Sequence, residues 1–255
     1  MALEIHALVR HDMHILSTHQ PDETSMTDFL AQYAHYVENG AITDRRLKRV
    51  IETAQARQRD LMMMMEDVHN PHNLMAIARS CDAFGVQNIA FTMEDENLFN
   101  PTEIGKVSSA SASKWLDYRI FENGTRNAIT TLQNEGWHVM ATWVNPEARS
   151  IYEVDFASYD KLVLMVGNEK DGISKTAVEC ADSFIYIPME GMIESFNVSV
   201  AAALTLFETT RQRRASEKDF ALQGDALQAL IDDFVVRAIK PKYYEYVVDD
   251  DPSES

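Results

Sequence analysis

The chain has little of what marks secreted, membrane-spanning or dinucleotide-binding proteins. Its 255 residues include only two cysteines, Cys81 and Cys180, too few for a disulfide framework, so we expect a protein of the reducing cytoplasm. No apolar run approaches the roughly eighteen residues that cross a membrane. The first residues lack the basic and apolar regions of a secretory signal.

Several common site patterns are also missing. The nine glycines form neither a Gly-x-Gly-x-x-Gly fingerprint nor a Gly-Lys-Ser/Thr phosphate loop, which disfavours a nucleotide-binding oxidoreductase. There is no nucleophile elbow and no Cys/His pair of suitable spacing. The four histidines of the first 25 residues, His6, His11, His14 and His19, match no metal-ligand motif, so we expect no metal site.

The charge balance is strongly acidic. Against 40 Asp and Glu stand 23 Lys and Arg, a net charge of −17, which argues against a polyanionic partner. Basic residues are nevertheless clustered in two places, and a local basic patch holds phosphates on an acidic molecule. Solvated helix faces explain the same clusters equally well. The first cluster, assigned to one helix, is Arg45, Arg46, Lys48, Arg49, Arg57 and Arg59, and the second is Arg211, Arg213, Arg214 and Lys218.

Hydrophobic periodicity divides the chain into three segments. We expect residues 1–59 to form a helical extension with a basic helix from Asp44, and residues 216–255 to form a C-terminal helix with an acidic tail. Between them, residues 60–215 alternate short apolar runs with amphipathic helices. This alternation predicts an α/β domain with a mainly parallel sheet and flanking helices. Strands are expected at 61–65, 88–92, 118–121, 138–143, 162–166 and 184–187, and helices at 73–84, 125–136, up to 180, and from 195–197 to 214.

Three loops at the expected carboxyl edge of this sheet carry unusual polar residues: Asn70–Arg79, Gly167–Ser174 and Ile187–Ser199. Ligands of parallel sheets bind at this edge. The third loop leads into a helix headed by Ser195 and Asn197, whose free N–H groups suit an anion or a polar ligand. A helix cap alone is the alternative role of these two residues.

Taken in order, the three loops resemble the three motifs of the SpoU/TrmH family of RNA 2′-O-ribose methyltransferases, in the SPOUT superfamily. The matching segments are Asn-Pro-His-Asn-Leu-Met-Ala-Ile-Ala-Arg at 70–79, Leu-Met-Val-Gly-Asn-Glu-Lys-Asp-Gly-Ile at 164–173, and Ile-Pro-Met at 187–189 with Ser-Phe-Asn-Val-Ser-Val-Ala at 195–201. The resemblance runs from about Thr43 to Arg214. Phe196 stands where the family usually has Leu, Asn70 where it is often basic, and Ser108–Ser113 is serine-rich rather than glycine-rich.

The resemblance implies a C-terminal trefoil knot, S-adenosylmethionine as methyl donor, and a homodimer. The TrmH type is the nearest match and implies methylation of the D-loop guanosine at position 18 of tRNA. A ribosomal-RNA methyltransferase of the same family, or a knotted RNA-binding protein that has lost catalysis, are the alternatives. By family position, the expected catalytic residues are Arg79, Asn73, Glu169, Ser195 and Asn197. The expected cofactor-binding residues are Thr142, Gly167, Ile187, Met189, Phe196 and Ser199. From their positive charge, we take Arg45, Arg46, Arg49, Arg57 and Lys114 as candidates for contacts with RNA phosphates.

Each of these residues also has an ordinary structural role open to it. Asn73 is placed to cap a helix, and Glu169 in a glycine-flanked loop is otherwise a solvated carboxylate. Arg79 would otherwise be an exposed helix arginine. The apolar members of the cofactor set serve equally as core.

Overall fold

The computed structural model describes residues 23–93, 113–121 and 123–239. The four N-terminal histidines, residues 108–112 of the serine-rich loop and the acidic tail lie outside the described residues. The chain divides into two compact units. One comprises residues up to Ala56 together with those from Leu222 onward, and the other is Arg57–Ala221.

The first unit brings together helices from the two ends of the chain: α2 (Glu23–Gln32), α3 (Ala34–Glu38), α4 (Asp44–Gln55) and α10 (Gly224–Ala238). Buried Tyr33 donates its hydroxyl to the Asp232 carboxylate and accepts a hydrogen bond from the Gln228 side-chain amide at 2.6 Å. Burial, with the Asp232 contact, raises the pKa of Tyr33. The sequence indicates two separate extensions, whereas this hydrogen-bonded contact joins α10 to the N-terminal helices.

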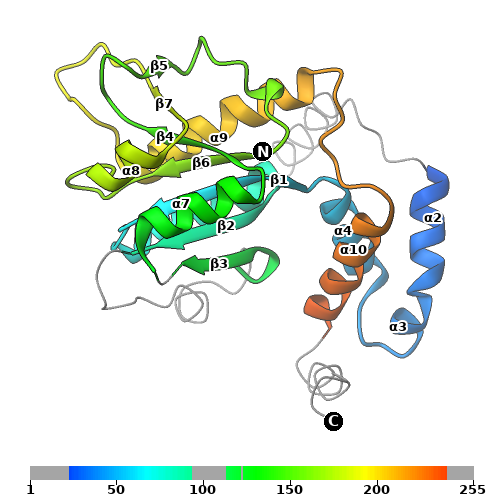
Figure 1. Ribbon diagram of the computed structural model, residues 1–255. Helices are drawn as coiled ribbons and strands as arrows, with labels where there is room; N and C mark the ends of the chain where they lie inside the picture. The colour runs from blue at the N-terminus through cyan, green and yellow to red at the C-terminus, as the bar shows by residue number, and fades with distance from the viewer. Residues whose placement is uncertain (1–22, 94–112, 122, 240–255) are drawn as a thin grey trace, which may run out of the picture. The chain divides into compact units, whose positions relative to one another are not determined.

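The second unit is built on a seven-stranded sheet in the order β3-β2-β1-β6-β4-β7-β5, and every pair of neighbours is parallel (Figure 1). The α/β architecture with a mainly parallel sheet is therefore confirmed. The strands are β1 (Gln58–Glu66), β2 (Val86–Thr92), β3 (Asp117–Phe121), β4 (His138–Thr142), β5 (Arg149–Ser150), β6 (Leu162–Val166) and β7 (Ser183–Tyr186).

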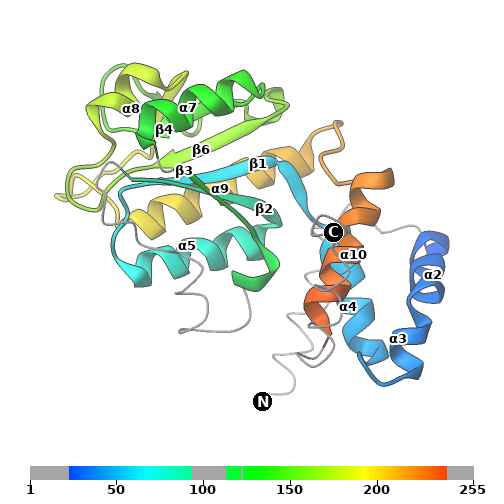
Figure 2. The same cartoon turned by 60° about the horizontal axis from the view of Figure 1, so that its bottom comes forward.

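Helices cover both faces of this sheet. Figure 2 shows α5 (Pro71–Phe84) and α9 (Val198–Ala215) on one face, and α7 (Gly124–Asn134) and α8 (Lys175–Cys180) on the other. Successive residues of a strand point to opposite faces, so Met63 and Met65 of β1 pack in the α5/α9 core, and Met62 and Met64 pack in the α7/α8 core. Burial on both faces explains why the strands are continuously apolar. Short 3₁₀ turns lie at Ser113–Trp115 and Phe156–Ser158.

The structure corrects several predicted boundaries. Helix α5 begins at Pro71, two residues earlier than predicted, because the Asn70 side chain caps the His72 N–H at 2.9 Å and Pro needs no hydrogen-bond partner for its nitrogen. The basic helix α4 ends at Gln55 and β1 begins at Gln58, so Arg57 and Arg59 are not part of that helix. The two-residue strand β5 was not predicted.

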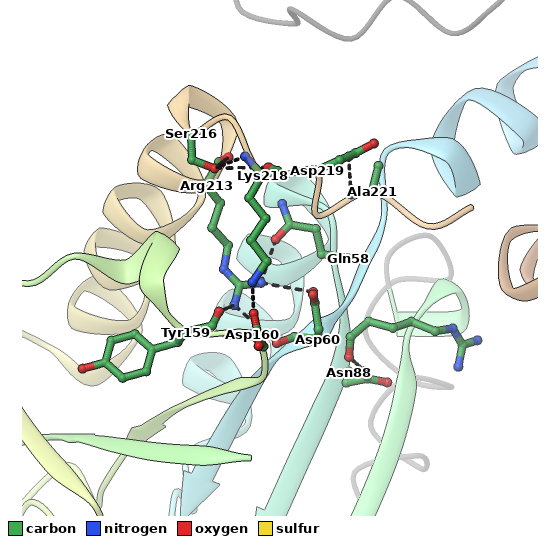
Figure 3. Close-up of polar contacts among 11 residues, drawn as sticks. Gln58, Asp60, Asn88, Tyr159, Asp160, Arg213, Ser216, Lys218, Asp219 and Ala221 are labelled. Carbon is green, nitrogen blue, oxygen red and sulfur yellow. Dashed lines mark hydrogen bonds and ion pairs between the residues drawn. The ribbon is translucent and has the colours of Figure 1, made fainter. Parts of the chain in front are cut away.

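A buried arginine fixes the end of α9 against the start of β1. The guanidinium of Arg213 donates to the Asp60 carboxylate at 3.1 Å, to the Gln58 side chain at 3.2 Å and to the Tyr159 carbonyl at 3.0 Å (Figure 3). Phe220 packs on the guanidinium, 4.2 Å from ring centre to guanidinium carbon, and Lys218 pairs with Asp160. Arg213 belongs to the second basic cluster of the sequence, but its side chain is fully buried and not on a solvated helix face.

We expect Arg213→Ala to lower the free energy of unfolding by about 3 kcal/mol, measured by urea denaturation. Removing one member of a buried ion pair costs about 3–5 kcal/mol, and the lower end applies because Asp60 is 34% exposed. The matched control is Arg126→Ala, which breaks the surface pair with Glu179 at 2.7 Å and should cost less than about 1 kcal/mol. Equal effects of the two substitutions would contradict this role for Arg213.

Candidate active site

Three loops follow the carboxyl ends of β1, β6 and β7 at one edge of the sheet. The first runs from Asp67 into α5, the second is Gly167–Ser174 after β6, and the third is Ile187–Asn197 before α9. These are the loops that carry the three motifs. Because β1 and β6 are adjacent strands, the first two loops are neighbours although about 100 residues separate them in the sequence.

Asn73 joins all three loops through its side-chain amide. Its Nδ2 donates to Glu169 Oε1 at 3.0 Å, and its Oδ1 accepts from Asn197 Nδ2 at 3.1 Å. Glu169 Oε1 also accepts the Asn70 backbone N–H at 3.1 Å. Asn73 is buried, whereas Glu169 and Asn197 are exposed on either side of it. Asn73 therefore does not serve as the cap of α5, a role that Asn70 takes.

The electrostatics of Glu169 follow from these contacts. Partial burial raises the pKa of its carboxyl group, but hydrogen bonds from the Asn73 side chain and from the backbone N–H groups of Glu169, Asn70 and His69 outweigh burial, and the net pKa lies below its ordinary value. Hydrogen bonds that favour the charged form act in this direction. Glu169 is therefore an ionised acceptor at neutral pH that orients the Asn73 amide.

Asn197 has two roles at once. Its Oδ1 caps α9 by accepting from the Ser199 backbone N–H at 2.9 Å and from the Ser199 hydroxyl at 2.6 Å, while its Nδ2 reaches Asn73. The helix begins at Val198, so Ser195 lies in the loop before the cap rather than at the head of the helix. Ser195 is exposed at this edge.

Arg79 lies on the exposed surface of α5. It is six residues from Asn73, about 9 Å along the helix axis. Among the described residues it forms no hydrogen bond or ion pair, so its guanidinium is available to a ligand.

The residues expected to hold a cofactor surround the ends of β4, β6 and β7. Gly167 is buried, and Thr142 donates its hydroxyl to the Met165 carbonyl at 3.2 Å. A side chain at Gly167 does not fit, because its Cβ would lie 2.3 Å from the backbone of Gly172 and Ile173. The apolar members, Ile187, Met189 and Phe196, lie in the third loop and are all half-buried.

A pocket of about 330 Å³ lies beside the Gly167–Ser174 loop. It is lined by Glu66, Asp67 and His69 and by residues of the loop itself. Within the described part of the chain, no group of three or more His, Cys, Asp or Glu side chains is arranged to hold a metal ion.

The candidate phosphate-binding residues are not all on the surface. Arg45, Arg46 and Arg49 are exposed on α4, opposite its buried apolar face, and Lys114 is exposed over the ring of Trp115. The prediction that Arg57 contacts RNA phosphates is wrong. Its side chain is fully buried, and its guanidinium donates to the Asp82 carboxylate and to the Asp82 carbonyl. A guanidinium that is buried and bonded to Asp82 does not reach RNA in this structure.

Comparison with known proteins identifies the family. The family model described as SpoU rRNA Methylase family matches residues 60–207. The chain belongs to the SpoU methylase family. The matched range contains all three loops and every candidate catalytic residue.

Two curated relatives of this SpoU methylase are named tRNA (guanosine(18)-2′-O)-methyltransferase. The protein from Thermus thermophilus is 40% identical over 176 residues, covering 67% of this chain and 84% of that protein. The Aquifex aeolicus protein is 37% identical over 172 residues, covering 68% and 79%. A solved structure, described as A. aeolicus TrmH/SpoU tRNA modifying enzyme, matches with a TM-score of 0.64 and 33% identity, covering 80% of this chain and 98% of that one.

Gly167→Ala tests the packing of the second loop. The new methyl group would meet backbone rather than a movable side chain, so we expect the free energy of unfolding to fall by about 1–3 kcal/mol, measured by urea denaturation. Gly191→Ala in the third loop is the control, because nothing lies within 4 Å of its Cβ position. Wild-type stability of Gly167→Ala would show that the loop has room to move away.

Proposed function

We propose that this SpoU methylase transfers a methyl group from S-adenosylmethionine to the 2′-hydroxyl of guanosine 18 in the D-loop of tRNA. The observation that carries the proposal is the hydrogen-bonded line Glu169–Asn73–Asn197, which unites the three family motifs at one sheet edge. Two relatives, at 37% and 40% identity, bear the name of this activity. The reaction also suits a protein in the cytoplasm. In the part of the chain that the structure describes, no helix could cross a membrane.

The residues at the ends of β4, β6 and β7 fit the cofactor. S-adenosylmethionine supplies a methyl group on a sulfonium centre. The half-buried side chains of Ile187, Met189 and Phe196 offer apolar contact to an adenine ring. Among the described residues the Met189 backbone N–H donates no hydrogen bond, so it is available to a ring nitrogen. Thr142 and Ser199 add hydroxyl groups near these loops.

Methyl transfer requires that a ribose hydroxyl, a poor nucleophile at neutral pH, be positioned and its developing negative charge stabilised. Arg79 is the residue for this role. A guanidinium group is a reluctant base, so we assign Arg79 to hold the hydroxyl and an adjacent phosphate by bidentate hydrogen bonds. Asn73, fixed by Glu169, and Asn197 place the ribose. Ser195 precedes Asn197 by two residues in the third loop.

Binding of tRNA is assigned to the exposed basic face of α4, with Arg45, Arg46 and Arg49, and to Lys114. These positive side chains contact phosphates, which position RNA without reading its sequence. The net charge of −17 weakens long-range attraction, so we expect the affinity to depend on this local patch. A ribosomal-RNA substrate is the second candidate, favoured by the description of the matching family model.

The decisive experiment is incubation of the purified protein with radiolabelled S-adenosylmethionine and unmodified tRNA, followed by mapping of the labelled nucleotide. We expect label on the 2′-oxygen of guanosine 18. A tRNA with a 2′-deoxyguanosine at that position is the matched control and should stay unlabelled. Label on a ribosomal-RNA transcript but not on tRNA would favour the second candidate.

Substitution of Arg79 tests its role in the same assay. Arg79→Ala should lower kcat by about 10²-fold or more, because a group that stabilises developing charge is lost. Arg79→Lys keeps the charge but not the planar fork, so we expect it to lose at least about tenfold. Turnover of Arg79→Lys close to wild type would contradict bidentate binding.

The knot and the homodimer are proposals as well. After β7 the chain returns beneath the sheet as α9, which packs against α5 and β6, an arrangement compatible with a trefoil knot (Figure 2).

Helix α9 exposes an apolar stripe of Val200, Leu204 and Phe207, which are 44%, 38% and 52% exposed. Residues four and three apart share one helix face. A second copy of this chain is the occupant we propose for this stripe.

Phe207→Glu tests the homodimer. A charge within the apolar interface should convert a dimer into monomers of 29.0 kDa, measured by light scattering after size-exclusion chromatography. Tyr152→Glu is the control, because Tyr152 is a large exposed side chain, 75% accessible, outside α9. A dimer that survives Phe207→Glu would place the interface elsewhere.

A further inference from the structure

A buried carboxyl group lies at the end of β1, away from the groups assigned to methyl transfer. Glu66 is the last residue of β1 and is 1% exposed. It accepts three hydrogen bonds: from the Thr125 hydroxyl at 2.6 Å, from the Ser174 hydroxyl at 2.6 Å and from the Ser174 backbone N–H at 2.8 Å. It therefore ties β1 to the start of α7 and to the residue that caps α8.

Burying a carboxyl group is unfavourable unless hydrogen-bond donors replace water. In the described residues no Lys, Arg or His forms an ion pair with Glu66. The three donors from Thr125 and Ser174 therefore replace the hydrogen bonds that water would give to the carboxyl group. Such a group is sensitive to substitution, because removing the acceptor takes one hydrogen-bond partner from each of two hydroxyl groups and an N–H group. Two of the three donors belong to one residue, Ser174.

Ser174 is the last residue of the loop that carries Glu169. The loop is closed on itself by paired backbone hydrogen bonds between Asn168 and Gly172, at 2.8 and 3.0 Å. Its first part is held by the Asn168 side-chain amide, which donates to the Asp67 carbonyl at 2.7 Å. The end of β1 therefore holds the loop at both sides, through Asp67 and through Glu66, and Glu169 lies between the two attachments.

We propose that Glu66 is a positioning residue for methyl transfer. By its hydrogen bonds to Ser174, Glu66 fixes the position of the Gly167–Ser174 loop at the sheet edge. The loop in turn positions the Glu169 carboxylate, which orients Asn73. Glu66 lies on the α7/α8 side of β1, whereas Asn73 lies in α5 on the opposite face, so Glu66 acts through the loop and not by touching substrate. The inference rests on the proposed function.

A double-mutant cycle on kcat separates this role from simple stabilisation. Glu66→Gln keeps the shape but loses one acceptor, and we expect kcat to fall about tenfold at a temperature well below its thermal midpoint. In a Glu169→Ala background, the same substitution should change kcat less than about twofold, since residues that act through one another are not additive. Thr125→Val is the matched control. It removes the donor from α7 but leaves the loop attachment, so kcat should stay within about twofold of wild type.

The inference is overturned if Glu66→Gln has wild-type kcat, or if it lowers kcat equally in both backgrounds, which is the result of a general structural role. If Glu66→Gln does not fold, Ser174→Ala removes the same hydroxyl contact and should show the same non-additivity with Glu169→Ala.

An NMR measurement keeps this test independent of the proposed function. If the wild-type protein methylates no RNA, the proposed function fails, but the side-chain amide signal of Asn73 still reports its bond to Glu169. That signal should shift in Glu66→Gln and stay in place in Thr125→Val. No shift in Glu66→Gln would overturn the inference whatever the activity.

Discussion

The side-chain amide of Asn73 is the contact on which the site depends. It is bonded to both other motif loops, donating to Glu169 and accepting from Asn197. A side-chain amide has both an N–H donor and a carbonyl acceptor. An aliphatic, ammonium or carboxylate side chain lacks one or both, so it could not bond to both Glu169 and Asn197. Because Asn73 is buried, loss of either partner leaves a polar group unpaired. The site is thus held by the same hydrogen bonds that define its geometry.

The sheet supplies the frame for this contact. Strands β1 and β6 are adjacent and parallel, so their carboxyl ends bring together residues that lie about 100 positions apart. Continuous burial of Met62–Met65 between two helix layers gives β1 little freedom to move. At the opposite end of the sheet, Arg213 ties α9 to the start of β1. Helix α9 therefore begins at the site and ends at a buried ion pair.

Much of this arrangement could be predicted from the sequence. Alternating apolar runs and helices imply a parallel sheet, and a parallel sheet brings the Asn73 and Glu169 loops to one edge. Burial of charged residues could not be predicted, because Arg57, Arg213 and Glu66 look like surface residues until their partners Asp82, Asp60 and Ser174 are known. Likewise, no local pattern indicates that α10 joins the N-terminal helices, since the Tyr33–Asp232 contact spans 199 residues.

The most direct test of the account is a crystal structure of the protein with S-adenosylhomocysteine, the product left after methyl transfer. We predict that the adenosine lies beside Thr142, Gly167, Ile187 and Met189. The sulfur should face the hydrogen bond between Asn73 and Asn197. A ligand bound instead in the pocket lined by Glu66, Asp67 and His69 would contradict the assignment of the site.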